Sequence, residues 1–504
     1  MGKEKRQLKG RREIVLPIDV EELTPDIIGN VLSHCLKIHD ENVKDMELLE
    51  NYLFGDRPIT KRVKKIRPDI DNKVLVNYPV KIVRDLNSYF LEKPITWTSK
   101  NGEASNAIEL LAKVLKSESK DLLDMELAQT VGTYGVGYRG QYSETSGDDE
   151  YPLLLANHSP LTTFVVKSSS AGNPDLFSVS IVENLDMEAL KQGNVETEES
   201  YLVYTRTQTM VFKQNKDKYV LDGTAENHYF GGIPIVEYTN NQWRYGDFEM
   251  VVDLIDALDK IYSDRTNAVE QLVQSILVFI NCEIDDETLD DLSNNLAISI
   301  KSYKGSTNQG GLDSSDVKFV TSPLNQRDTQ SLADEIESYI TALTGIMTRS
   351  TRPGGGQDTG EAVYLRDGGR DMETIARIKE SSFMSSERKC LRIIANILKV
   401  NGIVDVDTSD IEIKFTRNAS NNLLNKAHAI AILNNTKILK PEDTLSIAGI
   451  SSAPVDMAER GVKYWDSREA ALGQDESPRT QEASPLNDKE ATTASLEGVQ
   501  PSNA

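Results

Sequence analysis

The sequence is poor in the residues that build covalent and metal cross-links. Among 504 residues there are only three cysteines, Cys35, Cys282 and Cys390, which lie far apart and form no CxxC pair. An odd number without zinc-ligand spacing supports neither a disulfide framework nor a zinc site. The five histidines are scattered, which favours structural or solvated roles for them. We therefore expect a protein of a reducing cytoplasm that binds no metal and no cofactor.

Long hydrophobic runs are also missing. No stretch approaches the roughly 20 apolar residues that a membrane span needs. The apolar run Ile276–Ile280 is short and fits a helical pattern. The first residues are basic but lack the apolar core of a secretory signal. We expect no membrane association, and we interpret residues 1–20 as a flexible basic arm.

The motifs of several enzyme classes are absent. The chain has no GxxxxGK[ST], HExxH or GxSxG sequence, which argues against P-loop ATPases, zinc proteases and α/β-hydrolases. Two features keep an enzymatic alternative open. The glycine-rich stretch Pro353–Gly360 has the geometry to cradle an anion, although a flexible connector explains it better. The acidic run Glu283–Asp291 offers ligands for the metal of a nucleic-acid-processing enzyme, although such runs are more often solvated helix faces.

Basic charge is in deficit. The chain carries 79 acidic and 56 basic residues, a formal net charge of −23. A protein that grips nucleic acid through its phosphates normally presents a basic face, so this balance argues against a tight clamp. It does not argue against a protein past which DNA must slide, because weak or repulsive contact suits that task.

The first half of the chain predicts helices followed by strands. Thr24, Pro25 and Asp26 form a good helix start, and amphipathic spacing continues to Leu53. A second helix runs from Pro79 to Leu91, and residues 103–131 have helical spacing. A basic stretch at 61–67 lies in a loop between them. From 135 to 238 the period changes to that of strands with turn residues between them, which predicts an antiparallel β region.

The second half returns to helix. Residues 247–280 predict one long amphipathic helix, about 50 Å in length at 1.5 Å per residue. A mixed insertion at 281–325 separates it from a second amphipathic helix at 327–343, so the two can pair antiparallel. A third helix at 361–400 contains Gly368 and Gly369, where we expect a kink or a break.

The end of the chain predicts a strand and short helices. The strand spans 411–416, and helices follow at 420–434, 441–448 and 454–470. The tail from Gln474 lacks periodicity and is expected to be disordered. The fold class is thus α+β and mainly helical.

Four segments resemble, in this order, segments of tailed-bacteriophage portal proteins, and the match is closest to the type found in siphophages of Gram-positive hosts. They are the helix and strand around Phe90–Trp97, the strand Gly232–Asn241, the helix start Thr359–Leu365 and the strand end Phe415–Asn418. The resemblance covers roughly residues 25–470. It implies a structural protein rather than an enzyme.

The resemblance also implies a ring-forming portal fold, in which successive parts of the chain have different roles. The expected parts are a wing at 21–246, stem helix 1 at 247–280, a clip at 281–325, stem helix 2 at 326–343, a tunnel loop at 344–360, a long kinked wing helix plus strand at 361–418, crown helices at 419–470 and a disordered tail at 471–504.

Three sets of residues follow as candidate site residues. The tunnel loop, at the narrowest point of a DNA channel, would present Thr348, Arg349, Ser350, Thr351, Arg352, Gly354, Gly355, Gly356 and Gln357. The polar face of stem helix 1 would line the channel with Asp253, Asp256, Lys260, Ser263, Asn267 and Gln274. The clip would dock the packaging motor and later an adaptor through Glu283, Asp285, Asp286, Glu287, Asp290 and Asp291.

A portal of this family implies a ring of twelve copies at one capsid vertex, through which double-stranded DNA is packaged and ejected. The partners expected are other copies of the chain, double-stranded DNA, the terminase packaging motor, a head-completion or adaptor protein, and capsid and scaffolding proteins. The location expected is the virion, and the host cytoplasm during assembly. Besides the nuclease, a scaffold or capsid-interaction protein that forms no ring remains an alternative.

Overall fold

The computed structural model describes residues 9–65, 68–100, 106–143, 151–185, 197–216, 218–273, 276–280, 282–283, 301–302, 316–320, 326–347, 369–417, 430–433, 444 and 454–473. The chain forms two compact units, residues 1–427 and 428–504, and each is described by itself.

Four helices open the first unit. Helix α1 (Pro25–Phe54) begins as predicted, because the Thr24 side chain accepts a hydrogen bond from the backbone N–H of Ile27, and it ends at Gly55 with φ 87°. Helix α2 spans Tyr78–Phe90. The helical stretch predicted at 103–131 is two helices, α3 (Asn106–Ser117) and α4 (Lys120–Tyr134), separated at Ser119 by a left-handed backbone with φ 52°.

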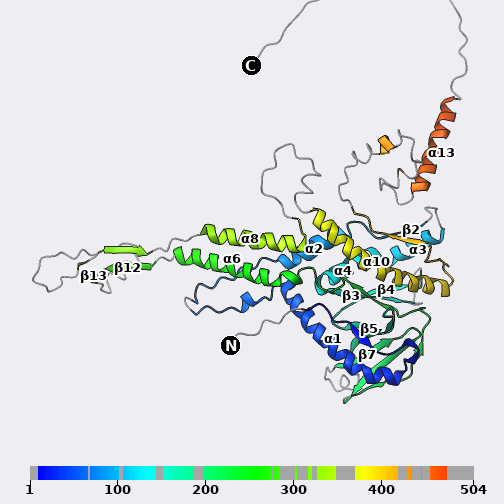
Figure 1. Ribbon diagram of the computed structural model, residues 1–504, viewed down its shortest axis with the longest axis horizontal. Coiled ribbons are helices and arrows are strands. Elements are labelled where there is room, and N and C mark those ends of the chain that lie inside the picture. Colours follow the sequence, from blue (N-terminus) through cyan, green and yellow to red (C-terminus); the bar gives the residue numbers. More distant parts are fainter. Residues whose placement is uncertain are drawn as a thin grey trace, which may run out of the picture. The chain divides into compact units, whose positions relative to one another are not determined.

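A seven-stranded sheet confirms the predicted β region (Figure 1). Its order is β1-β5-β6-β7-β8-β10, and β9 also pairs with β8. The strands are β1 (Ile14–Leu16), β5 (Thr163–Ser168), β6 (Asp175–Leu185), β7 (Thr197–Tyr204), β8 (Gln208–Asn215), β9 (Lys218–Leu221) and β10 (Glu226–Asn227). The described pairings are antiparallel except that of β1 with β5. Helix α1 packs on this sheet through Ile28, Leu32 and Cys35, which share a core with Phe177 and Phe212.

The prediction of a flexible arm at residues 1–20 is wrong for its described part. Strand β1 extends the sheet, and Ile14 and Leu16 are buried in the sheet core. Arg11 is also buried, and its guanidinium donates to a Glu249 carboxylate oxygen 2.6 Å away. The sequence suggests an arm because a strand of three residues is too short to show an alternation of apolar and polar positions. The contacts that order them come from far along the chain.

A three-stranded sheet packs one face against both α4 and a long helix. Its order is β11-β3-β4, with β11 at Ile235–Thr239, β3 at Val136–Tyr142 and β4 at Leu154–His158. Helix α10 (Gly369–Val400) packs on it, and a small pair of strands, β2 (Thr96–Ser99) and β16 (Ile411–Lys414), lies nearby. Residues 361–368, Gly368 among them, lie outside the described residues. The kink or break predicted at Gly368 and Gly369 therefore stays a prediction.

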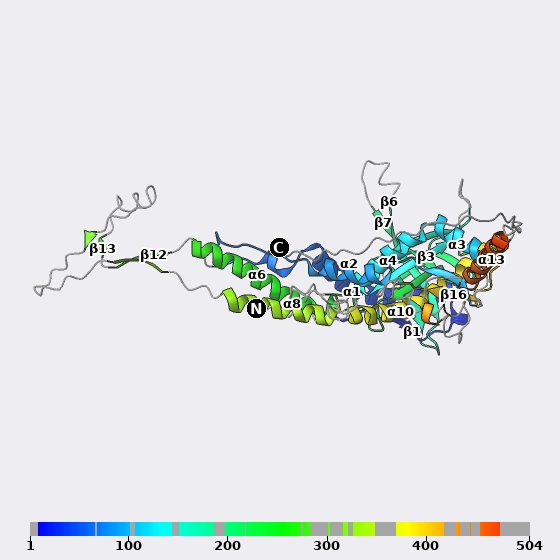
Figure 2. The same ribbon diagram turned by 90° about the horizontal axis from the view of Figure 1, so that it is seen from above.

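Helices α6 (Val252–Val273) and α8 (Gln326–Thr344) lie side by side in both views (Figures 1 and 2). Tyr262 contacts Glu337, and Arg265 contacts Gln330, so the two helices run antiparallel, as predicted. Their bases share one core with α1 and α2, which includes Leu49, Ile82, Ile255 and Ile340. A short 3-10 turn, η3 (Glu249–Val251), precedes α6.

The prediction that this helix continues to residue 280 is wrong. Residues Ile276–Ile280 form strand β12, which pairs antiparallel with β15 (Asp316–Val320), and β13 (Cys282–Glu283) pairs with β14 (Lys301–Ser302). A run of five apolar residues fits either a helix face or a buried strand, and periodicity alone cannot distinguish the two. The strand predicted at 317–320 is confirmed by β15.

In the second unit, helix α13 (Pro454–Gly473) confirms the helix predicted at 454–470. Residues 430–433 are helical, within the helix predicted at 420–434. Most of the helix predicted at 441–448 lies outside the described residues, as does the tail from Gln474. Among the helices that the structure describes, none is long and apolar enough to cross a membrane.

Candidate functional site

The predicted channel face of α6 is divided between solvent and the interior of the chain. Asp253 and Lys260 are exposed. Asp256 is half-buried and accepts a hydrogen bond from the Tyr52 hydroxyl at 2.8 Å. Ser263 and Asn267 are 0% and 3% exposed, which removes them from any surface of this chain. Gln274 lies outside the described residues.

Ser263 and Asn267 hold an extended segment, residues 68–77, against α6. The backbone N–H of Asn72 donates to Asn267 Oδ1 at 2.7 Å, and that of Val74 donates to Ser263 Oγ at 2.9 Å. Buried N–H groups must find acceptors, and in this segment side chains of the helix supply them. Sequence periodicity assigns both residues to the polar face but cannot show that a neighbouring backbone occupies it.

The same segment is anchored at its end by a buried ion pair. Arg57 donates to Asp259 at 2.8 Å, and both side chains are at most 1% exposed. The guanidinium also donates to the Asn77 side chain and to the Val76 carbonyl, at 2.8 and 3.1 Å. Burial raises the pKa of the Asp259 carboxyl, and the Arg57 hydrogen bond opposes that rise. The segment is therefore attached to α6 through three residues of the helix, Asp259, Ser263 and Asn267.

The described part of the basic stretch 61–67 is largely engaged within the chain. Lys61 pairs with Asp56 at 3.0 Å, and Arg62 pairs with Asp264 at 2.7 Å. The Lys64 ammonium donates to the Ile70 carbonyl. These contacts favour the solvated loop over a nucleic-acid patch. Residues 66 and 67 lie outside the described residues.

Helix α8 has a second apolar stripe that faces solvent. Ala333, Ile336 and Ile340 are buried against α6. Leu332, Tyr339 and Leu343 are 48%, 52% and 52% exposed. Their spacing of seven and then four residues places them on one side of the helix. An exposed apolar stripe of this kind marks a surface that another element covers.

Asp247, just before α6, is the centre of a buried polar cluster. Its carboxylate accepts from the Lys379 ammonium of α10 at 2.6 Å and from the Asn240 amide at 2.8 Å. The amide of Asn87, on α2, lies 3.3 Å from the same carboxylate. Full burial lowers the pKa of Lys379, and the Asp247 charge opposes this. Gly132 is required beside the cluster, since a Cβ there would lie 2.5 Å from the Asp247 carboxylate.

The segment Gly232–Asn241 thus has a structural explanation. Ile235 and Tyr238 are core residues of β11, and Asn240 holds Asp247. Asn241 donates to the Tyr245 carbonyl and accepts from the Tyr245 N–H, which closes the turn before α6. The motif therefore sets where α6 starts.

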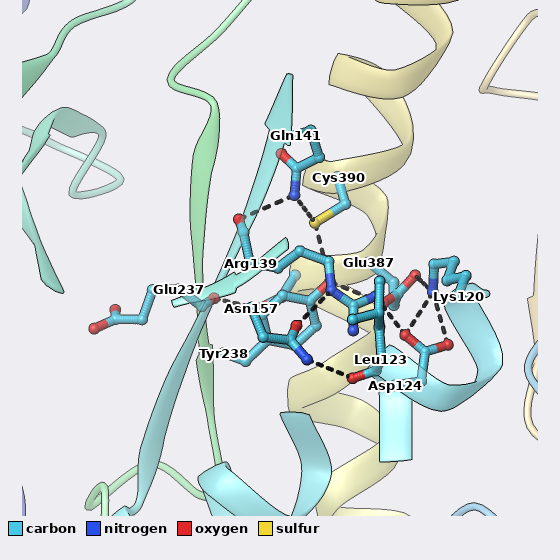
Figure 3. A network of polar contacts seen from close by, with 11 residues as sticks. Lys120, Leu123, Asp124, Arg139, Gln141, Asn157, Glu237, Tyr238, Glu387 and Cys390 are labelled. Carbon is cyan, nitrogen blue, oxygen red and sulfur yellow. Dashed lines mark hydrogen bonds and ion pairs between the residues drawn. The ribbon is translucent and has the colours of Figure 1, made fainter. Parts of the chain in front are cut away.

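A second buried network joins α4, β3 and α10 (Figure 3). Asp124 accepts from Lys120 at 2.8 Å and from Arg139, and Glu387 lies 3.0 Å from the Lys120 ammonium. The Tyr238 hydroxyl donates to Glu387 at 2.8 Å. Two cations and two carboxylates, all at most 3% exposed, are balanced there in a dry environment.

The charges and the burial of this network shift the pKa values of its members. Asp124 is the main attraction that raises the pKa of Arg139 against the opposing effect of burial. Burial raises the pKa of the Cys390 thiol to about 12, so the thiol stays protonated. Sequence reasoning missed this network because its members come from positions 120 to 390, with no local spacing to mark them.

The strand end Phe415–Asn418 is also structural in its described part. The Phe415 ring stacks on Phe90, with ring centroids 5.5 Å apart. Arg417 pairs with Glu380 at 2.6 Å and with Glu373 at 3.2 Å, so it ties the chain back to α10. The Arg417 hydrogen bond is foremost among the contacts that lower the pKa of Glu373 against the effect of burial.

Several predicted site residues lie outside the described residues. They are the tunnel-loop residues at 348–352 and 354–357, the helix start at 359–365, and Asp285, Asp286, Glu287, Asp290 and Asp291. Glu283 is described, in strand β13. In the part of the chain that the structure describes, no group of three or more His, Cys, Asp or Glu residues is placed to hold a metal ion.

The end of α8 lies against the first turns of α10. Gly345, just after α8, has φ 66°, and a Cβ there would lie 2.3 Å from the Ile375 side chain of α10. Ile346 is buried in the same core as Met372. The chain thus leaves α8 and enters α10 at one place on the first unit.

The chain has similarities to known proteins. Two solved structures titled as the virion of a native gene transfer agent particle and the neck of an empty one are similar over 81% of this chain and 94% of theirs, at 11% identity. Their TM-scores are 0.42 and 0.41, too low to support an argument. No curated protein matches the chain. The family model of the phage portal protein, SPP1 Gp6-like, matches residues 32–460, and the chain therefore belongs to this family of portal proteins.

Proposed function

We propose that copies of this chain form a ring at one vertex of a phage capsid, and that double-stranded DNA enters and leaves through its centre. Family membership is the principal support, since portal proteins are structural components of the capsid and not enzymes. The geometry that fits is the antiparallel pair α6 and α8, whose outer stripe of Leu332, Tyr339 and Leu343 is apolar and uncovered. In a ring, that stripe would pack on the next copy.

The parts of the chain receive roles within this proposal. The α6–α8 pair would be the stem, the strands beyond it the clip, residues 21–246 and α10 the wing, and the second unit the crown. We propose a ring of twelve copies, with the terminase motor and then a head-completion protein docking on the clip. Capsid and scaffolding proteins would surround the wing. Assembly would take place in the host cytoplasm.

The channel face that we propose on α6 contains fewer residues than the sequence predicts. Asp253 and Lys260 remain candidates because both are exposed, whereas Ser263 and Asn267 are buried within the chain. Asp256 is kept as a partly accessible member. An acidic lumen would repel phosphates, so that DNA moves without adhering.

The tunnel loop is proposed from the position of the two helices that flank it. Helix α8 ends beside the first turns of α10, which supports a loop between these two helices. We propose that Arg349 and Arg352 touch the DNA backbone from this loop. Their replacement by alanine is expected to reduce the DNA packaged per particle while rings still form.

The ring is tested through the α8 stripe. Wild-type protein is expected to give a native mass of about a dozen copies by light scattering, and particles with a central hole by negative stain. Leu332→Lys with Leu343→Lys places charges on the apolar stripe and is expected to leave the protein monomeric with an unchanged thermal midpoint. The matched control is Val220→Lys, an exposed valine on β9 (51%) far from the stripe in sequence. Rings formed equally well by the double variant would refute the assigned contact.

A further inference from the structure

The solvent face of α10 is basic, although the chain as a whole is strongly acidic. Its exposed charged residues number six cations and one carboxylate, Asp371. The cations are Arg370, Arg377, Arg388, Lys389, Arg392 and Lys399. The carboxylates of the helix at 373, 380 and 387 are turned toward the body and are half-buried or buried. The chain has a net charge of −23, so a basic face is unusual on it. We therefore look for an acidic partner that binds this face.

Arg388 and Arg392 pair with no carboxylate among the described residues. Lys389 pairs with Asp175 at 2.6 Å, and Arg377 pairs with Glu373 at 2.9 Å. Among the described residues, Arg388 contacts only the Met384 sulfur at 3.8 Å, and Arg392 pairs with no carboxylate. Both arginines line a shallow hollow of about 380 Å³.

The hollow is lined by small and apolar side chains as well as by the cations. Ser381 and Ser385 lie one helical turn apart and are small, while Met384 adds an apolar wall. Arg388 and Arg392 continue the same line along α10, because positions separated by three and four residues share one face. The face therefore offers small residues for close approach, with two arginines at one end.

Helix α4 presents the complementary face. Leu122 and Met125 are exposed large hydrophobics, at 58% and 47%. Asp121 and Glu126 flank them, and these are the two exposed charged residues of α4, both acidic. The face thus combines two apolar side chains with two carboxylates, where α10 has small residues and two arginines.

The two faces do not pair with each other within one chain. The buried sides of α4 and α10 meet at the Lys120–Asp124–Glu387 cluster (Figure 3). Among the described residues, no ion pair joins Asp121 or Glu126 to Arg388 or Arg392, so the two exposed faces are free to meet other copies. A head-to-tail contact, which joins two different faces of successive copies, closes a ring when the rotation between copies allows it.

We propose that the basic face of α10 binds the acidic face of α4 of a second copy of this chain. Leu122 and Met125 of one copy lie over Ser381 and Ser385 of the next, and Asp121 and Glu126 pair with Arg388 and Arg392. This contact rests on the proposed ring and adds to it a second interface, distant from the α8 stripe. Charge complementarity selects the partner, since the acidic face required is present on the chain itself.

The test is a charge reversal with rescue by mixing. One variant carries Arg388→Glu and Arg392→Glu, and the other carries Asp121→Lys and Glu126→Lys. Each alone is expected to raise the protein concentration for half-maximal ring assembly by about tenfold, since two exposed ion pairs become repulsions. An equimolar mixture is expected to assemble as wild type does, because each altered face then meets an oppositely altered one in an alternating ring.

Mixing distinguishes a contact between copies from damage within one. The matched control, Lys37→Glu with Lys44→Glu, makes the same charge change on exposed positions of α1 and is expected to assemble normally. Variants that assemble normally, or whose loss mixing does not repair, would overturn the α4–α10 contact while leaving the ring intact. A wild-type protein that stays monomeric would instead refute the proposed function. If the α10 variant forms rings but no longer retains double-stranded DNA, the face binds nucleic acid and the proposal fails.

Discussion

Lys379 illustrates what a single buried charge contributes to this fold. Its ammonium lies 2.6 Å from the Asp247 carboxylate, and both side chains are at most 5% exposed. The pair joins α10 to the residue before α6, two elements that the linear sequence separates by more than a hundred positions. Breaking a buried pair leaves an uncompensated charge in a dry site.

Lys379→Met is therefore expected to lower the free energy of unfolding by about 3–5 kcal/mol. The control is Lys389→Met on the same helix. The pair of Lys389 with Asp175 is partly exposed, at 47% and 24%, and its loss is expected to cost less than about 1 kcal/mol. Urea unfolding of the two variants measures the difference. Equal losses would mean that Asp247 does not depend on Lys379 for its charge balance.

A second prediction at this scale concerns pH. Burial lowers the pKa of His39, whose ring lies against Phe164 and contacts the Leu161 carbonyl at 3.0 Å. The unfolded chain therefore takes up a proton near pH 6.5 that the folded chain does not. It follows that the free energy of unfolding falls as the pH drops from about 6.5 through the folded pKa, by at most about 1.4 kcal/mol per pH unit.

His39→Gln is expected to flatten this decline between pH 7 and pH 5, measured by urea unfolding at each pH. His34→Gln, at an exposed position of the same helix, should keep the wild-type decline. A decline that His39→Gln leaves unchanged would assign it to other groups, such as the half-buried His158, whose pKa burial also lowers.

At the scale of elements, α6 shows that a polar helix position can serve the backbone of a neighbour. Ser263→Ala with Asn267→Ala would leave the N–H groups of Val74 and Asn72 without acceptors, at a cost of about 1–3 kcal/mol each. Hydrogen exchange at these two amides is expected to accelerate. Thr266→Ala, an exposed position on the same helix, should leave both amides protected. Unchanged protection in the double variant would show that the segment is held from elsewhere.

The elements also show which parts of the fold the sequence can predict. Helices α1, α6, α8 and α10 have a clear period, and their existence was predictable from it. Strand β12 was not, because five apolar residues carry no period of their own. Strand β4 was missed, since Leu154–His158 shows no alternation of apolar residues. The family motifs marked true structural positions, such as Asn240 and Arg417, but their partners at Asp247 and Glu380 became evident only in three dimensions.

At the scale of the whole molecule, the hydrophobic cores lie in the first unit. Each of the three described core clusters is built from residues between Ile14 and Phe415. A chain that ends at Ala427 is therefore expected to keep its thermal midpoint within about 2 °C, which corresponds to less than about 1 kcal/mol for domains of this class. Differential scanning fluorimetry measures it. Loss of a cooperative transition would show that the second unit contributes to the cores of the first.

Strand β1 has a consequence for the order in which the molecule is completed. Ile14–Leu16 pairs with Val166–Ser168, about 150 residues further along the chain. At the 5–20 residues per second of ribosomal synthesis, Ile14–Leu16 waits roughly 8–30 s before its partner strand exists. From the synthesis of β5 until β1 pairs with it, that edge of β5 has no neighbour, and an unpaired edge is a template for pairing with other chains. Strand β1 thus pairs only after residues far behind it have been made, and its pairing covers this edge of β5.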